Sequence, residues 1–245
     1  MATLAKYTRI LVDEYDFSTD SNSLSIAIAI PSIDVTCFQA TAYEWLSSFP
    51  SGSIVHGGFM IPSTSEGTLE KEIYDRIGSS TSAIVTAQVG TNTDACPSYV
   101  LSATYTDTFE IDTPIEGALM VNGNWIGTIR RGLRMWTGTF SSMAAQTSPA
   151  YIDLGAQATA GGFAYLHIQA IVDGATNAVI ILESDDNTGF SSAATECTWT
   201  FSAVGAEEKT LSGTIDRYIR LRCTDLGTAT SFTVVGIACA SGITY

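Results

Sequence analysis

The chain has 245 residues, of which 45% are hydrophobic and only 15% are charged, so a sizeable core is expected and the composition argues against disorder. Its formal net charge is −14 at pH 7, because 25 Asp and Glu outnumber 11 Lys and Arg. Such an acidic chain is not a typical DNA binder, since neutralising phosphates needs Lys and Arg. No apolar run approaches the roughly 18 residues of a membrane span. The first residues show no signal-peptide pattern, so we expect neither a membrane span nor secretion by that route.

The cysteines form an odd, widely spaced set, and neither a CxxC pair nor a Cys/His ligand spacing is present. That pattern argues against a structural zinc site. Buried, reduced thiols in a chain that folds in a cytoplasm are the simplest expectation. The cysteines are Cys37, Cys96, Cys197, Cys223 and Cys239.

The first 60 residues are expected to form short strands. Residues 9–13 predict a strand, and residues 14–18 predict a turn. Apolar side chains then recur at every second position, which places them on one face of a strand. These side chains are Leu24, Ile26, Ile28 and Ile30. Pro31 ends that run, and further strands are predicted at residues 34–38 and 53–60.

One helix is predicted at residues 68–77. Thr68 is a suitable N-cap, and Gly78 is suitable just beyond the C-terminus. Acidic residues in the first turn and Arg76 in the last turn match the helix dipole. Apolar residues at every fourth position give one stripe that can pack against a sheet. The stripe consists of Leu69, Ile73 and Ile77.

Strands are predicted to resume after the helix. They are expected at residues 82–89, 99–106 and 108–111. The pair Asn122-Gly123 is a strong hairpin signal and predicts a turn between strands at residues 117–121 and 125–129.

The composition changes at residues 137–150, which are rich in Ser, Thr, Ala, Gln and Gly and are predicted to link two domains. Beyond them, short strands with regular spacing are typical of a β-sandwich. They are predicted at residues 163–172, 178–183, 197–203, 209–212, 218–223 and 231–238. We therefore expect a mainly all-β protein, with residues 1–140 as a β domain holding the one helix. Residues 150–245 are expected to form an Ig-like or jelly-roll-like sandwich.

Two constellations could carry chemistry, and each has a simpler interpretation. Residues 185–189 faintly resemble a calcium loop, but the acids are contiguous and the glycine comes early, so a solvated hairpin turn is favoured. Cys37 and His56 could form a Cys–His dyad, but no third group orients them, so a packed thiol and an ordinary strand histidine are favoured. The chain has no phosphate-binding, serine-hydrolase or zinc-protease motif. We expect no enzyme activity, no metal and no cofactor.

Arg130, Arg131 and Arg134 form the one basic cluster. Contacts to DNA phosphates are one interpretation, but the acidity of the chain favours ion pairs with acids of a neighbouring subunit. Arg220 and Arg222 share one face of a strand, for which a solvated sheet face is favoured over a partner-binding face. Three tryptophans could line a sugar-binding surface, but core or interface packing is favoured. These are Trp125, Trp136 and Trp199.

Short segments along nearly the whole chain form a recognisable succession. It runs from a short strand that closes on a turn, through a serine-rich strand and an Asp-Val-Thr segment, to a Pro-containing turn and a Gly-Gly-Phe strand before the helix. The segments are residues 10–18, 22–25, 33–38, 49–52 and 57–59. This succession resembles that of tail tube proteins of tailed bacteriophages. The same pattern continues at residues 99–110, 115–117 and 130–133, and an appended sandwich of these proteins resembles residues 164–170 and 214–220.

The resemblance implies a β-barrel-like tube domain with one flanking helix, assembled in sixfold rings that stack into a DNA conduit. It implies a structural virion protein, made in the host cytoplasm, without catalytic residues. The implied partners are further copies of the chain and other virion proteins, with DNA only as non-specific cargo and no membrane. The net charge of −14 predicts an acidic lumen that repels the DNA. Two alternatives stay open. One is a capsid decoration protein that stabilises the head, and the other is a glycan-binding module acting through residues 150–245.

Overall fold

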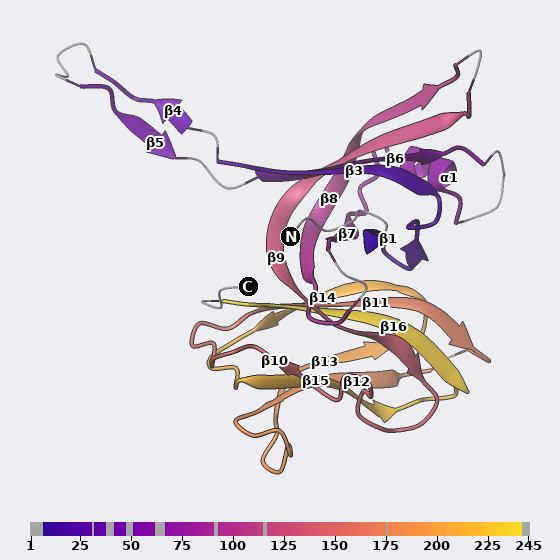
Figure 1. The fold of residues 1–245 in the computed structure, drawn as a ribbon, viewed down its shortest axis with the longest axis vertical. Coiled ribbons are helices and arrows are strands. Elements are labelled where there is room, and N and C mark those ends of the chain that lie inside the picture. Colours follow the sequence, from indigo (N-terminus) through magenta and orange to yellow (C-terminus); the bar gives the residue numbers. More distant parts are fainter. Residues whose placement is uncertain are drawn as a thin grey trace. The chain divides into compact units, whose positions relative to one another are not determined.

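The computed structural model describes residues 7–30, 32–37, 42–47, 51–61, 67–90, 93–114, 117–174 and 176–241. Strands dominate these residues and form open sheets, without a closed barrel in the described part of the chain (Figure 1). The prediction of a mainly all-β fold with one short helix is confirmed. The elements are β1 (Arg9–Val12), β2 (Tyr15–Asp16), β3 (Ser21–Ala29), β4 (Ser32–Asp34), β5 (Trp45–Ser47), β6 (Ser51–Phe59), α1 (Leu69–Asp75), β7 (Ala83–Gln88), β8 (Pro97–Asp112), β9 (Met120–Phe140), β10 (Ile152–Asp153), β11 (Gly162–Val172), β12 (Ala178–Asp185), β13 (Ala194–Phe201), β14 (Gly205–Leu211), β15 (Tyr218–Asp225) and β16 (Ser231–Ala240).

The chain forms two compact units that interleave along the sequence. Unit 1 comprises Met1–Ser18, Thr86–Val100 and Arg130–Tyr245, and unit 2 comprises Thr19–Val85 and Leu101–Ile129. Strands β8 and β9 contribute residues to both units. The two domains expected from the sequence, residues 1–140 and 150–245, stay a prediction, namely that each part of the chain folds by itself.

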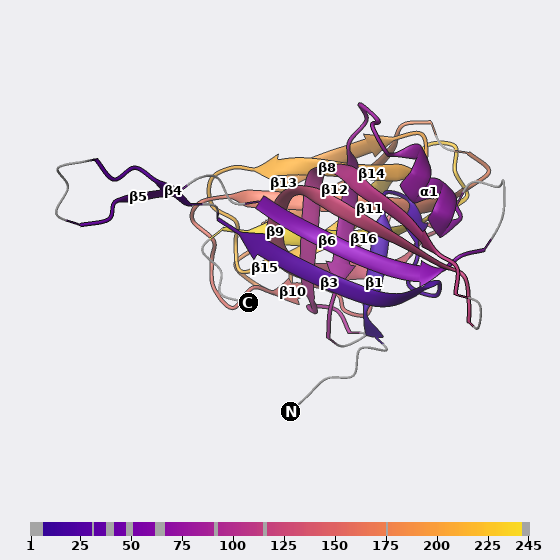
Figure 2. The ribbon, with the colours of Figure 1, turned by 90° about the horizontal axis from the view of Figure 1, so that it is seen from above.

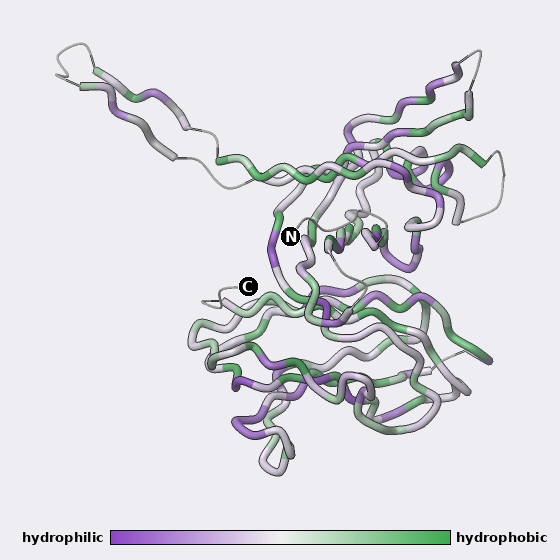
Figure 3. The backbone as a smooth tube through the Cα atoms, in the orientation of Figure 1, coloured by the Kyte–Doolittle hydropathy of each residue, from purple (hydrophilic) through white to green (hydrophobic). Residues whose placement is uncertain are grey.

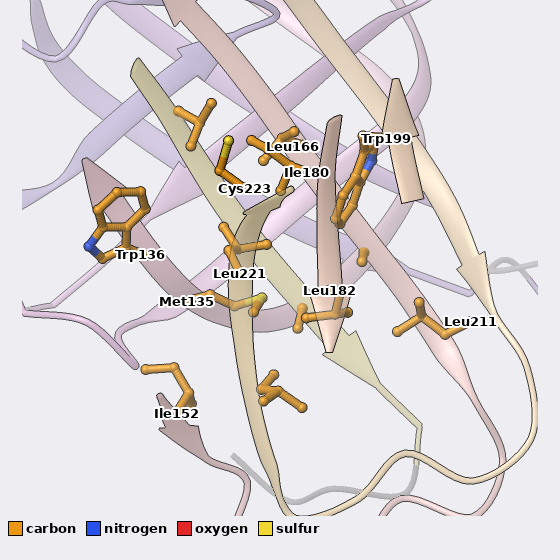
Figure 4. Close-up of a cluster of buried hydrophobic side chains, with 14 of the residues drawn as sticks. Met135, Trp136, Ile152, Leu166, Ile180, Leu182, Trp199, Leu211, Leu221 and Cys223 are labelled. Atoms are coloured by element: carbon orange, nitrogen blue, oxygen red, sulfur yellow. The ribbon is translucent and has the colours of Figure 1, made fainter. Parts of the chain in front are cut away.

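Unit 1 contains a sandwich of two sheets around one hydrophobic core. The order β14-β11-β16-β9 belongs to the larger sheet, and the smaller sheet has the order β10-β15-β12-β13. All six strands predicted between residues 163 and 238 are present, as β11 to β16. Figure 4 shows apolar side chains of both sheets gathered in one buried cluster. The second half of β9 completes the larger sheet, because residues 133–140 pair with β16.

Residues 137–150 are bonded into unit 1. Residues 137–140 are the end of β9, and Gln146 is only 2% exposed. Its side-chain Oε1 accepts a hydrogen bond from the backbone N–H of Leu221 at 2.8 Å, and its Nε2 donates to the carbonyl oxygen of Pro149 at 3.0 Å. The bond to Leu221 attaches the segment to β15, so a domain boundary here would require it to open.

We expect Gln146→Ala to weaken this attachment. The substitution leaves the N–H of Leu221 without its acceptor, which costs about 1–3 kcal/mol when the group is buried. The free energy of unfolding in urea should fall by that amount, and proteolysis within residues 141–150 should become faster. Gln157→Ala is the matched control, since it removes an exposed amide that bonds Asp216, and its effect should stay within ~0.5 kcal/mol. Equal losses in the two variants would contradict the structural role of Gln146.

Unit 2 is built on β3, β6 and the first half of β9, which lie side by side (Figure 2). Both pairings are antiparallel, and Ile54 of β6 stands between Ile26 and Trp125. Helix α1 confirms the predicted helix, with Thr68 as the N-cap and Arg76 as the C-cap. Strands β4 and β5 form a two-stranded sheet of their own. In the described part of the chain, no helix has the length and apolar character to cross a membrane.

The predicted hairpin at Asn122-Gly123 is wrong. Both residues lie inside β9, which continues through them without a turn. Pairing with β6 holds the backbone extended and overrides the local turn preference. The strands predicted at residues 99–106 and 108–111 likewise form one strand, β8. Pro31 and residues 38–40, 49–50 and 115–116, which belong to predicted strands or turns or to the segments that resemble tail tube proteins, lie outside the described residues.

Candidate assembly surface

Three adjacent strand segments of unit 2 contain no Asp, Glu, Lys or Arg: β3, β6 and residues 120–129 of β9. In a chain of net charge −14, the charges are therefore concentrated elsewhere. Because side chains alternate along a strand, this sheet has two distinct faces. The covered face includes the fully buried Ile54, His56 and Trp125. The opposite face, which we call the uncharged face, carries Ser25, Ala27, Ser53, Val55, Asn122, Asn124 and Ile126.

Helix α1 packs on the covered face through Leu69 and Ile73, which are buried. A Cβ atom at Gly58 would lie 2.6 Å from Cδ2 of Leu69, and one at Gly123 would lie 2.9 Å from Cδ1 of Ile73. Glycine therefore lets the helix approach the sheet backbone more closely than any side chain would allow. This close approach, rather than a turn, explains the glycine in Asn122-Gly123.

We expect Gly123→Ala to destabilise the protein by pressing a methyl group against Ile73. Overpacking of this kind costs about 1–3 kcal/mol, and urea unfolding should show a loss in that range. Ile73→Val removes the Cδ1 atom that would lie closest, so the double variant should lose less than the sum of the single variants. Ile73→Val alone should cost ~0.5–1.5 kcal/mol. Strict additivity in the double variant would show that Gly123 does not meet Ile73.

His56 lies in the covered face and is bonded in its neutral form. Trp125 Nε1 donates a hydrogen bond to His56 Nδ1 at 3.0 Å, and the two rings are parallel within 1°. Because Nδ1 accepts this bond, it carries no proton. Burial lowers the pKa of His56 to about 4. The side chain is therefore a neutral part of the core at neutral pH.

His167, the second histidine, is held in the same neutral state within unit 1. Its Nδ1 donates to the carbonyl oxygen of Asp13 at 2.6 Å, and its Nε2 accepts from the hydroxyl of Thr86 at 2.8 Å. Burial lowers the pKa of His167 to about 4. Both histidines thus join separate segments of the chain through hydrogen bonds that need the uncharged ring.

We expect the free energy of unfolding to fall as pH decreases from about 6.5 to about 4. Both histidines have an ordinary pKa of 6.5, which applies to the unfolded chain, and a folded pKa of about 4. Above pH 6.5 both histidines are neutral in the folded and in the unfolded chain, so they do not lower the free energy of unfolding. Between these two pKa values the unfolded state binds protons that the folded state excludes, which costs about 3 kcal/mol per histidine at the lower end of the range.

Urea unfolding at neutral pH and at about pH 4.5 measures this loss. His56→Gln keeps an acceptor for Trp125 but cannot be protonated, so it should reduce the pH dependence relative to the unsubstituted protein. A pH dependence unchanged by the substitution would contradict the buried, neutral state of His56.

The outer edge of β3 is open in the described structure. Among the described residues β3 pairs with β6 alone, so its backbone groups on the other side have no strand partner there. The apolar stripe predicted for β3 is only partly covered, because Ile28 and Ile30 are 56% and 57% exposed. Figure 3 shows the hydrophobic character of this second half of β3. Val55 and Ile126 are also exposed, on the uncharged face.

The β4–β5 hairpin lies between β3 and β6 in the sequence and exposes apolar side chains. Val35 and Tyr43 are 43% and 79% exposed. Hydrogen bonds from the hydroxyl and the backbone N–H of Thr36 lower the pKa of Asp34, so the turn after β4 is held around a carboxylate. The hairpin follows β3 in the sequence, so it is a second exposed apolar segment close in the chain to the open strand edge.

The structure does not form the Cys37–His56 dyad. Cys37 is exposed and its thiol donates to the carbonyl oxygen of Val35, whereas His56 is buried against Trp125. All five cysteines are free thiols in the structure. His56 is a packed core residue, as the simpler interpretation holds. The packed thiol expected at Cys37 is wrong, because that side chain is exposed, and Cys197 is only half-buried, whereas Cys96, Cys223 and Cys239 are buried as expected.

The structure divides the basic cluster. Arg130 donates to the carboxylate of Glu208 at 2.9 Å, and Arg134, which is 4% exposed, donates to Asp94 at 3.1 Å. Arg131 is the exposed member. Arg130 and Arg134 therefore meet acids of their own chain. A role for Arg130, Arg131 and Arg134 between subunits stays a prediction.

The other arginines and the tryptophans have structural roles. Arg220 and Arg222 both contact the carboxylate of Glu183, which is 3% exposed, so this face of the smaller sheet carries an ion-pair network. The favoured interpretation of the tryptophans as core residues is confirmed, and they form no sugar-binding surface. Their exposed fractions are 0% for Trp125, 6% for Trp136 and 0% for Trp199.

Residues 185–189 run from the last residue of β12 into the turn before β13. The carboxylate of Asp185 accepts hydrogen bonds from the backbone N–H groups of Asn187 and Ser192, at 3.1 and 2.9 Å. Burial raises the pKa of Asp185, but these bonds outweigh that effect and the pKa is lowered. The carboxylate thus organises the turn. The described residues contain no group of three or more His, Cys, Asp or Glu suited to a metal ion.

Comparisons with known proteins give distant structural likenesses. No family model matches the chain, and no curated protein matches it. The chain is similar to one in a native gene transfer agent virion, at 11% identity and a TM-score of 0.38, over 54% of this chain and 98% of that one. It is also similar to the Dit protein of phage SPP1, a hub protein of an adsorption apparatus, at 11% identity and a TM-score of 0.38, over 94% of this chain and 98% of that one.

A third likeness is to a chain of the phage p2 baseplate in its activated conformation, at 7% identity and a TM-score of 0.34, over 94% of this chain and 97% of that one. At these TM-scores and identities the likenesses do not determine a family.

Proposed function

We propose that the chain is a non-enzymatic structural component of a phage virion that assembles with further copies of itself into rings, as the major tail tube protein. The observation that carries the proposal is the open edge of β3. An exposed strand edge pairs with another chain unless charges, proline or irregular geometry prevent it. Ser21–Ala29 contains no charged residue and no proline, so these blocking features are missing along most of the strand.

Ring formation follows from pairing between unlike edges. If β3 of one copy pairs with a different strand of the next, the contact is heterologous, and it closes into a ring when the rotation between copies permits. The resemblance to tail tube proteins implies six copies in a ring and stacking into a tube, with DNA as non-specific cargo. The net charge of −14 supports passage rather than binding of DNA, because binding requires neutralised phosphates.

A capsid decoration protein remains the alternative. It would use the same exposed segments to bind the head lattice, and it would not form free rings. Electron microscopy of the purified full chain, alone and with capsids, separates the two functions. The buried tryptophans offer no surface on which a sugar could stack, and glycan binding by residues 150–245 stays the less favoured alternative.

Two neighbouring proline substitutions test the edge. The N–H groups of Ala27 and Ile28 point to opposite sides of β3, since successive residues alternate. One N–H therefore faces β6 and the other faces the open edge. Proline removes the N–H and is tolerated only on the side that bonds no strand of the same chain. We expect one variant to lose stability, and the other to keep its circular dichroism and thermal transition but to sediment as a monomer.

The matched pair controls for the proline itself, because both side chains are exposed. Sedimentation velocity measures assembly. Rings formed by both variants at the level of the unsubstituted protein would reject the open edge as the interface. A strict monomer before any substitution would reject ring formation.

A further inference from the structure

The outer face of the smaller sheet carries a surplus of positive charge. On β15 the side chains of Ile219 and Leu221 lie in the core, so Arg220 and Arg222 point away from it, because side chains alternate along a strand. Both arginines contact the carboxylate of Glu183 on β12. Two arginines and one glutamate give this network a net charge of +1, in a chain whose net charge is −14.

The two arginines are held differently. The guanidinium of Arg220 contacts Glu183 and lies 3.9 Å from the ring centroid of Phe190, and its side chain is 19% exposed. Arg222 reaches Glu183 only at 3.8 Å, and its side chain is 50% exposed. Arg222 therefore keeps N–H donors for a further acid. Arg220 is already ordered, which lowers the entropy cost of binding a partner at this face.

The last part of β8 presents acids that could meet these arginines. Glu110 and Asp112 are exposed, and they share one face because they lie two positions apart on a strand. Among the described residues, neither of them is in an ion pair. Two positions span about 6.6 Å along a strand, and Arg220 and Arg222 have the same spacing on β15. The two pairs thus match in sign and in spacing.

We infer that the Arg220–Arg222 face of one copy binds Glu110 and Asp112 of another copy. The inference rests on the proposed function and adds a second contact between copies, apart from the edge of β3. Exposed ion pairs contribute little individually, so one such contact does not hold two single copies together. Repeated by every subunit of a ring, the contacts act together, because linked sites raise each other's effective concentration. The contact therefore joins one ring to another.

The charge of the chain favours a second copy as the partner. Acidic copies repel each other as a whole, so their association needs a place where opposite charges meet. Every copy carries both halves of this contact, the arginines on β15 and the acids on β8. The contact also fixes orientation, since a reversed approach would place acids against acids.

Charge reversal on each side tests the contact. Rings of the full chain are compared by sedimentation velocity and electron microscopy for unsubstituted, Arg222→Glu and Glu110→Lys protein. Both variants leave β3 unchanged and should form rings. The protein concentration at which rings associate should rise about tenfold in each, because the attraction at the contact is lost or reversed. Preformed rings of the two variants, when mixed, should form pairs, since the unsubstituted arginine face of one meets the unsubstituted acids of the other.

Lys209→Glu is the matched control. It changes the net charge by the same amount as Arg222→Glu, but on β14 of the larger sheet, where Lys209 pairs with Glu207. Its rings should associate at a concentration within about twofold of the unsubstituted value. Circular dichroism verifies that each variant is folded. If an added acid beside Glu183 prevents folding, Arg222→Gln replaces Arg222→Glu. High salt should weaken the association of unsubstituted rings, because exposed ion pairs are screened.

The outcomes separate the inference from the proposed function. Unsubstituted rings that never associate, or rings that associate equally well in both variants, overturn the inference while ring formation stands. A loss in the Arg222 variant without a loss in Glu110→Lys also overturns it, because the arginines then bind a different acid. So does a mixture of the two variant rings that forms no pairs, since the charges would then act within one chain. Absence of unsubstituted rings overturns the proposed function and the inference together.

Discussion

Strand β9 is the element on which both units depend. Its residues 120–127 pair with β6 in unit 2, and its residues 133–140 pair with β16 in unit 1. A slip of one residue in either pairing would turn the buried side chains of that half outward. In unit 2 the slip would expose Trp125 and separate it from His56, and it would move Gly123 away from α1. The register of one strand therefore maintains the core of each unit and the access of the helix to the sheet.

Much of this fold could be predicted from the sequence, because helix stripes, period-two strands and turns are local patterns. The helix and all six strands of the second half were found in this way. The Asn122-Gly123 hairpin was mispredicted because the deciding interactions are not local. One is pairing with β6, and the other is contact between Gly123 and Ile73 of the helix, which lies 50 positions earlier in the chain. A glycine that permits a turn and a glycine that permits close packing look the same in sequence.

The candidate surface could be predicted from the sequence even less than the fold, because it depends on contacts between distant segments. The arginine cluster was visible, but its partners were not, because Glu208 lies 78 residues from Arg130 and Asp94 lies 40 residues from Arg134. The lack of charge in residues 21–29, 51–59 and 120–129 can also be read from the sequence. Only the strand pairing shows that these segments are neighbours, and only the packing of α1 shows which of their two faces is uncovered. The lack of charged residues in each segment indicates a surface only when the fold places the three segments side by side.

The charge distribution also bears on how identical acidic copies can associate. Copies of net charge −14 repel each other, and salt at 0.1 M screens that repulsion only beyond about 10 Å. Paired strands lie ~4.8 Å apart, well inside this distance, so acids at the contact itself would oppose pairing most strongly. Strand β3 has no acid to bring into the contact and no ion to desolvate there. The same absence of charge therefore permits close approach of the strand edges and leaves a neutral face beside them.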